Sequence, residues 1–164
     1  MSQTRFINPQ ALGKPPGYTH VVEVMAPGRI VYIAGQLGVD RDGKVVGDFR
    51  HQAVQTFENL KTALAAVGAE FRHVVKLNNY LVDRAHLPTF REVRDSYLPE
   101  KDRPASTTIA ISGLAREGAL IEIEAVAMLP AAARSKAASK SASKSAGKGR
   151  TARSARRTSR PRRK

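Results

Sequence analysis

The chain lacks cysteine, any long apolar run, and acidic residues in its C-terminal segment 131–164. Without cysteine, disulfide bonds, thiolate nucleophiles and zinc–thiolate sites are excluded, and the absence fits a reducing cytoplasm. No apolar run approaches the roughly 20 residues that a membrane-spanning helix needs. The N-terminal sequence MSQTRFINPQ also lacks the apolar segment of a secretory signal. We therefore expect a soluble, cytoplasmic protein that does not contact a membrane.

The positive charge of the chain is concentrated at one end. Of the 28 Lys and Arg residues, 13 lie in 131–164, which contains no Asp or Glu. Residues 1–130 hold the other 15 together with all 14 acidic residues, so nearly all of the net charge of +14 belongs to the C-terminal segment. We therefore divide the chain into a domain at 1–130 and a basic tail at 131–164. A domain of about 130 residues is large enough to bury one hydrophobic core.

The composition of the basic tail is typical of disorder. Ala, Ser, Lys and Arg dominate it, and without large apolar side chains it cannot bury enough surface to offset the entropy lost on ordering. Two roles remain open: a solubilising appendage, or non-specific nucleic-acid binding driven by counterion release. No aromatic residues are interleaved with the cations, so base stacking is not expected. An acidic protein surface would be an alternative partner.

The patterning of the first half of the domain predicts two strands and a helix. Residues 21–25 and 29–36 are strand-like and flank Ala-Pro-Gly, which favours a tight turn, so we expect them to form a β-hairpin. Asp48 is a candidate helix N-cap and Gly68 a candidate helix stop. Between them, apolar residues recur at three- and four-residue steps, as in an amphipathic helix. These residues are Ala53, Phe57, Leu60, Leu64 and Val67.

The second half of the domain continues this alternation. Residues 74–82 are rich in β-branched and aromatic residues and predict a strand. A shorter helix is expected over 87–98, with Pro88 tolerated in its first turn. Two alternating stretches, RPASTTIAIS at 103–112 and IEIEAVAML at 121–129, predict the last two strands. The order β-β-α-β-α-β-β indicates a two-layer α+β domain with two helices on one face of a mixed sheet.

Small polar side chains and carboxylates alternate with apolar residues in the last two strands. Ser106 and Thr108 fall on one face of the first of them, and Glu122 and Glu124 on one face of the second. We expect these groups to share a face of the sheet, and we interpret that face as a subunit interface that contains a pocket. Two plainer interpretations remain open: Glu122 as a solvated strand carboxylate, and the Ser-Thr-Thr run at 106–108 as small residues that favour strands.

Several short motifs, in the right order, resemble the RidA (YjgF/YER057c/UK114) family and together cover most of residues 5 to 129. The motifs are Gly17-Tyr18, IAGQ at 33–36, Gln52 with Asn59-Leu60, Arg103-Pro104-Ala105, and IEIEAVA at 121–127. The resemblance implies a chorismate-mutase-like (YjgF-type) fold. It also implies a homotrimer, with ligand sites in the clefts between subunits. The basic tail lies outside the resemblance.

The resemblance also implies an activity and a set of site residues. The best-known reaction of the family is hydrolysis of reactive imines and enamines, released by pyridoxal-phosphate enzymes, to a 2-keto acid and ammonia. By motif, Glu122 would orient the attacking water. No cofactor is expected, and no metal, because the four histidines show no metal-ligand spacing. The substrate-binding residues implied by the motifs are Tyr18, Gly35, Ser106, Thr107 and Thr108.

The chain departs from the family pattern at Ser106. Members with imine deaminase chemistry carry arginine there, and a guanidinium can hold a substrate carboxylate through paired hydrogen bonds. Loss of such an anchor would cost a rate factor of roughly 10². Arg103 and Arg116 are the nearby candidates to replace it. Three functions therefore remain: a RidA-like imine or enamine deaminase, a non-catalytic protein that binds a small metabolite, and a nucleic-acid-associated protein acting through the tail.

Overall fold

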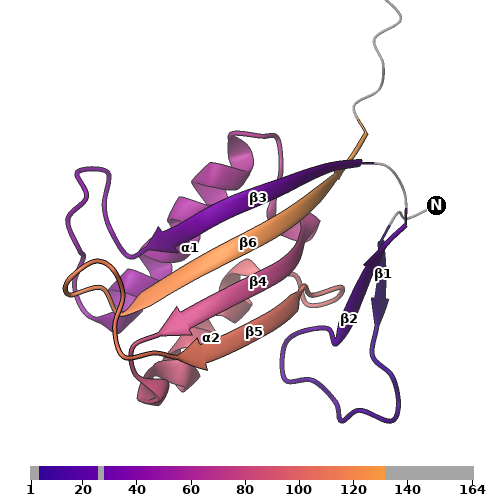
Figure 1. Cartoon of the computed structure of the whole chain (residues 1–164), viewed down its shortest axis with the longest axis horizontal. Helices are drawn as coiled ribbons and strands as arrows, with labels where there is room; N and C mark the ends of the chain where they lie inside the picture. Colours follow the sequence, from indigo (N-terminus) through magenta and orange to yellow (C-terminus); the bar gives the residue numbers. More distant parts are fainter. Residues whose placement is uncertain (1–3, 26–27, 132–164) are drawn as a thin grey trace, which may run out of the picture. The chain divides into compact units, whose positions relative to one another are not determined.

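A four-stranded mixed sheet, covered on one face by two helices, forms the body of the domain (Figure 1). The structure, a computed structural model, describes residues 4–25 and 28–131. The strands of this sheet are β3 (Gly28–Leu37), β4 (Val74–Leu81), β5 (Ala105–Ala110) and β6 (Ile121–Pro130). Their order is β3-β6-β4-β5, with β4 and β5 parallel and the other two pairs antiparallel. The predicted α+β architecture is confirmed.

The first helix, α1 (Phe49–Ala65), begins and ends close to the predicted signals. The carboxylate of Asp48 accepts a hydrogen bond from the amide of His51 at 3.0 Å, which makes Asp48 the N-cap. Beyond the other end, the amide of Gly68 donates to the carbonyl of Ala65 at 3.0 Å and closes the final turn. The predicted apolar stripe is buried at Ala53, Phe57, Leu60 and Leu64 and half-buried at Val67.

The second helix, α2 (Leu87–Tyr97), follows a short 3-10 turn, η2 (Arg84–His86). Pro88 lies in the first turn of α2, as predicted, and Phe90 and Val93 are buried in the core. Another 3-10 turn, η1 (Phe71–His73), leads into β4. No helix in the described residues is both long enough and apolar enough to cross a membrane.

The two N-terminal strands differ from the sequence prediction. β2 (Val21–Val24) pairs antiparallel with β1 (Thr4–Ile7), a strand that we did not predict, and the two form a separate two-stranded sheet. The predicted hairpin between 21–25 and 29–36 is therefore wrong. The strand β1 offers β2 complementary cross-strand neighbours, including an ion pair from Arg5 to Glu23 at 2.7 Å. Residues 26 and 27 of the expected turn lie outside the described residues.

The central strands bury one face and leave the other without a helix. Along β6, buried residues alternate with partly exposed ones, and the buried set faces α1 and α2. This confirms the predicted alternation of Glu122 and Glu124 with the isoleucines beside them. The opposite side, which we call the open face, carries exposed apolar side chains at Ile30, Tyr32 and Ile109.

The predicted basic tail lies outside the described residues from residue 132 onward.

A buried glutamine joins α1 to the loop that leads into β6. The side chain of Gln52 is almost fully buried. Its Nε2 donates to the carbonyl of Gly118 at 3.1 Å, and its Oε1 accepts from the amide of Leu120 at 2.8 Å. This residue therefore satisfies two backbone groups of the loop, the carbonyl of Gly118 and the amide of Leu120.

We expect Gln52→Met, which has a similar volume, to lower the free energy of unfolding by about 1–3 kcal/mol, because both backbone groups lose their partner. Urea denaturation measures this loss. The matched control is Gln55→Met, on the same helix, where the side chain is only partly buried and bonds to Asn59. Equal destabilisation by the two substitutions would contradict the assignment.

Candidate functional site

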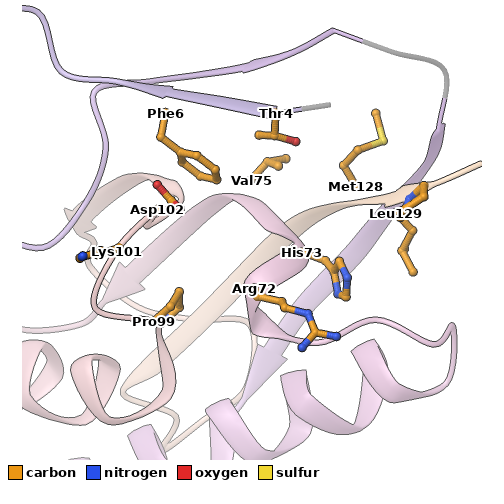
Figure 2. A pocket seen from close by; sticks show the side chains of 11 residues that line it. Thr4, Phe6, Arg72, His73, Val75, Pro99, Lys101, Asp102, Met128 and Leu129 are labelled. Atoms are coloured by element: carbon orange, nitrogen blue, oxygen red, sulfur yellow. The ribbon is translucent and has the colours of Figure 1, made fainter. Parts of the chain in front are cut away.

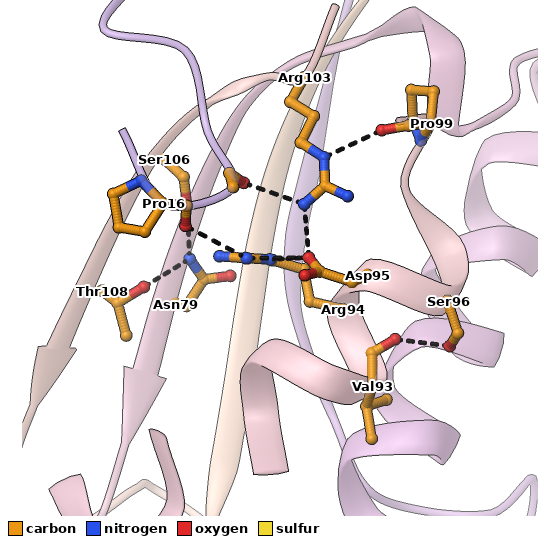
Figure 3. A network of polar contacts seen from close by, with 11 residues as sticks. Pro16, Asn79, Val93, Arg94, Asp95, Ser96, Pro99, Arg103, Ser106 and Thr108 are labelled. Carbon is orange, nitrogen blue, oxygen red and sulfur yellow. Dashed lines mark hydrogen bonds and ion pairs between the residues drawn. The ribbon is translucent and has the colours of Figure 1, made fainter. Parts of the chain in front are cut away.

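The structure places Ser106 and Thr108 on the face of the sheet that packs against the helices. In the parallel register of β4 and β5, the buried Asn79 lies beside Thr108. The amide Nδ2 of Asn79 donates to Ser106 Oγ at 3.0 Å and to Thr108 Oγ1 at 3.1 Å, so all three side chains point to the same side (Figure 3). Thr107 points the other way, where its hydroxyl accepts a hydrogen bond from Lys76 Nζ at 2.6 Å.

Glu122 and Glu124 lie on the opposite, open face. In the antiparallel register of β4 and β6, Tyr80 is paired with Glu122 and Asn78 with Glu124. Our expectation that the carboxylates share a face with Ser106 and Thr108 is therefore wrong. The parity of β5 relative to β6 is set through β4, which lies between them, and neither of the two strand sequences contains that information.

The two carboxylates of the open face have different surroundings. Glu124 Oε2 accepts hydrogen bonds from Tyr80 at 3.0 Å and from Asn78 at 3.2 Å. The bond to Glu124 raises the pKa of Tyr80, because ionising the phenol would lose this bond and place a second negative charge beside the carboxylate. Glu122 makes no hydrogen bond or ion pair with the described residues. Of the two, Glu122 is thus the carboxylate whose oxygens are available to a ligand or water.

Gly35 and Glu122 are brought together by an irregularity in β3. The register of β3 against β6 shifts between Ile33 and Gln36, and Gly35 lies within this shift. A Cβ atom at Gly35 would collide with the carboxylate of Glu122, so the carboxylate lies directly against the backbone at this position. Only glycine allows so close an approach. Two of the predicted site residues therefore do meet, on the open face.

A cavity of about 380 Å³ lies beside β5, over its helix-facing side. Tyr18, Ser106, Thr107 and Thr108 all line it, so the structure brings together four of the predicted substrate-binding residues. Glu122 and Gly35 are not among its walls. The other lining residues are Pro16, Leu81, Arg84, Leu87, Arg91, Arg94, Ile109 and Ala110.

Two arginines hold the segment that carries Tyr18 against the rest of the domain (Figure 3). The buried Arg94 donates to the carbonyl of Pro16 at 3.4 Å, and Arg103 donates to the carbonyl of Gly17 at 3.5 Å. Gly17 has a φ of +89°, and a Cβ there would meet both guanidinium groups. Because L-residues rarely adopt this conformation, glycine is required at this point of the loop.

Asp95 forms ion pairs with both of these arginines. Its Oδ1 lies 2.8 Å from Arg94 Nη2 and also pairs with Arg103 Nη1. Arg103 is further committed to the carbonyl of Pro99 at 3.0 Å. Arg116 bonds to the carbonyl of Gly43. Neither Arg103 nor Arg116 lines the cavity at Ser106, so neither supplies the guanidinium that the sequence lacks there.

The arginines that do line the cavity come from η2 and α2, and we did not predict this role for them. Arg91 and Arg94 are three residues apart on α2, which places them on one side of that helix, and Arg84 lies in the turn η2 just before it. That spacing was visible in the sequence. The sequence did not show that these arginines face β5, because it does not give the path of the loop that joins α2 to β5.

A larger cavity, of about 590 Å³, lies between β1 and the beginning of β4 (Figure 2). Side chains of Thr4, Phe6, Arg72 and Lys101 contribute to its walls. None of the predicted site residues lines it, and its charges are mixed in sign. We therefore place the candidate site at the β5–α2 cavity and at Glu122. In the described part of the chain, no group of three or more His, Asp or Glu side chains could hold a metal ion.

Comparison with known proteins identifies relatives of this chain. A family model described as endoribonuclease L-PSP matches residues 10–129. Protein DfrA of Myxococcus xanthus is 36% identical over 122 residues, covering 73% of this chain and 88% of that protein. A 2-iminobutanoate/2-iminopropanoate deaminase of Dermatophagoides farinae is 30% identical over 132 residues, covering 79% and 99%. The 3-aminoacrylate deaminase RutC of Acinetobacter baylyi is 34% identical over 117 residues, covering 70% and 91%.

Solved structures of Rid-family proteins share the fold of this chain. The crystal structure of YyfB, a Rid-family protein of unknown function from Yersinia pestis, superposes with a TM-score of 0.72 at 35% identity, covering 78% of this chain and all of that one. RidA from an Antarctic Psychrobacter superposes with a TM-score of 0.59 at 30% identity, covering 71% and 97%. With a family model that spans residues 10–129 and relatives of this similarity, the chain belongs to the RidA/YjgF family.

Proposed function

We propose that this chain forms a cytoplasmic homotrimer that hydrolyses small imines or enamines to a 2-keto acid and ammonia, with Glu122 as the carboxylate that orients the water. The observation that supports the proposal most directly is the contrast on the open face. Glu124 is engaged by Tyr80 and Asn78, whereas Glu122 lies against Gly35 with its oxygens unengaged by the described residues. Relatives named as imine and aminoacrylate deaminases support the reaction class.

The step assigned to Glu122 is to orient a water at the imine carbon and to accept its proton. The water adds to the imine carbon and passes a proton to the carboxylate, and the imine nitrogen takes up a proton from solvent. The carbinolamine then loses ammonia, and its hydroxyl group gives up a proton to solvent and becomes the keto group. A single carboxylate beside the substrate can accept the first proton and return it to the leaving nitrogen. Glu122 meets this requirement without a metal or cofactor.

The division of the candidate residues between two faces favours a site built by two subunits. Within one chain, the sheet itself separates Glu122 from Ser106 and Tyr18. A second copy packed on the open face would bring its own β5–α2 cavity toward Glu122, as the clefts of a homotrimer require. The exposed apolar residues of that face fit an interface: Tyr32 is 79% exposed, Ile30 56% and Ile109 46%.

A non-catalytic binding protein is the alternative for the same cavity. The observation that favours it is Ser106, a hydroxyl where deaminases of the family have a guanidinium. A ligand held without a fixed carboxylate anchor would be bound but poorly oriented for attack.

The tail suggests a separate function. Its thirteen cations, without a counter-charge in 131–164, favour non-specific binding of nucleic acid.

We expect Glu122→Gln to slow the decay of 2-iminobutyrate generated in situ by about 10²–10⁴-fold relative to the unaltered chain, because the amide cannot accept the proton of the water. Ammonia release or keto-acid formation measures the rate. Glu124→Gln is the matched control and should retain most activity. No acceleration by the unaltered chain would reject the deaminase and favour the binding protein.

We expect Tyr32→Glu to dissociate the trimer, because three carboxylates would be brought into an apolar interface. Size-exclusion chromatography with light scattering gives the mass. Val54→Glu, which alters an exposed apolar residue on α1, should leave the trimer intact. A monomeric unaltered chain would remove the shared-site proposal.

For the tail, we expect the full chain to bind duplex DNA with an affinity that falls by a factor of about 10³ or more between 50 and 200 mM salt, as counterion release requires. A chain truncated after Pro130 should not bind. Fluorescence anisotropy at the two salt concentrations measures both. Equal binding by the two chains would reject nucleic-acid binding by the tail.

A further inference from the structure

Asn79 determines how the hydroxyls of Ser106 and Thr108 are oriented. It is 1% exposed, and its Nδ2 contacts both hydroxyl oxygens and the carbonyl of Thr107, the last at 2.8 Å. An amide nitrogen only donates, so the two hydroxyl oxygens act as acceptors toward Asn79. Neither hydroxyl donates a hydrogen bond to any described residue. Each therefore keeps its own O–H hydrogen available for a molecule in the cavity that both residues line.

Two of the arginines that line the same cavity also have no hydrogen-bond or ion-pair partner among the described residues. Arg84, in η2, and Arg91, on α2, line the cavity, are exposed, and make no hydrogen bond or ion pair within the described part of the chain. Arg94, the third guanidinium, is already paired with Asp95 and bonded to Pro16. Two cations without a counter-charge remain, close to two hydroxyl donors.

No negatively charged side chain lines the cavity to balance the charge of these arginines. No Asp or Glu lines it, and the nearby Asp95, which pairs with the lining Arg94, is shared between Arg94 and Arg103. Its polar side chains thus offer donors and positive charge. A ligand with acceptor oxygens and a negative charge is complementary to such a surface, whereas a cation would be repelled.

We propose that Arg84 and Arg91 bind the carboxylate of a small 2-imino or 2-keto acid in this cavity, with Ser106 and Thr108 donating hydrogen bonds to it. The chain would then replace a guanidinium on β5 by guanidinium groups from η2 and α2. The volume of about 380 Å³ suits a molecule of a few carbon atoms, near the lower end of the range of ligand pockets. The choice of a 2-imino acid as substrate rests on the proposed function; the carboxylate site itself does not.

Equilibrium binding of the stable product 2-oxobutanoate to the full chain, followed by titration calorimetry, tests this site without turnover. We expect Arg84→Ala and Arg91→Ala each to weaken binding by about 10- to 100-fold, because each removes a charge-assisted hydrogen-bond donor. Arg50→Ala is the control. It removes the same charge from an exposed arginine on α1 that does not line the cavity, and should leave the affinity unchanged.

A neutral ligand of similar shape separates charge recognition from shape recognition. We expect 2-butanone, which lacks the carboxylate, to bind much more weakly than 2-oxobutanoate and to be insensitive to Arg84→Ala and Arg91→Ala. Both variants should keep the circular dichroism spectrum of the unaltered chain, since both side chains are exposed. Unchanged affinity for 2-oxobutanoate in both variants would overturn the proposal. Inorganic phosphate binding as tightly, with the same dependence on these arginines, would overturn its assignment to a carboxylate.

The outcomes for binding and for turnover are separable. If 2-oxobutanoate binding depends on Arg84 and Arg91 but the chain does not accelerate imine decay, the carboxylate site stands and the deaminase fails. If the chain turns over imines while neither arginine affects binding, the deaminase stands and the carboxylate site fails. When both stand, we expect Arg91→Ala to raise KM more than it lowers kcat, whereas Glu122→Gln should act on kcat.

Discussion

The register of β4 between β5 and β6 is the constraint on which both the core and the site depend. Leu77, Asn79 and Leu81 of β4 are buried toward the helices, while Asn78 and Tyr80 point to the open face. A shift of one residue against either neighbour would exchange these two sets and place two polar groups in the core. The same register decides that Ser106 and Thr108 lie on one side of the sheet and Glu122 on the other. The separation of the candidate residues is therefore a consequence of how the core is packed.

Asn79 connects that packing to chemistry. Its Oδ1 is buried and finds no partner among the described residues, which carries a desolvation cost. Its Nδ2 makes three contacts with β5 in return, and the two hydroxyl groups among them remain able to donate their own hydrogens. Asp95 forms ion pairs with Arg94 and Arg103, the two arginines that hold the loop carrying Tyr18. Asn79 and Asp95 therefore support residues of the site without lining the cavity themselves.

The guanidinium groups that line the cavity come from η2 and α2 and none comes from β5. The family resemblance puts an arginine on β5, whereas here the cavity takes Arg84 and Arg91 from η2 and α2, the elements that face that strand. The carboxylate of Glu122 lies against Gly35 in the irregular part of β3. Because these two parts lie on opposite sides of one sheet, a second subunit is what would unite them. In the proposed homotrimer, the subunit interface would then form part of the site.

The sequence by itself determined the elements whose signals are local. The Asp48 cap and the apolar stripe after it predicted α1, the β-branched run predicted β4, and alternation predicted which residues of β6 are buried. Motifs identified the family and the departure at Ser106. Only the tertiary structure decided that β2 pairs with β1, that Ser106 faces the helices, and that Arg84 and Arg91 reach the cavity in place of Arg103 or Arg116. The physical reason is common to these cases: each depends on the register or path of segments that are distant in sequence, which no local pattern encodes.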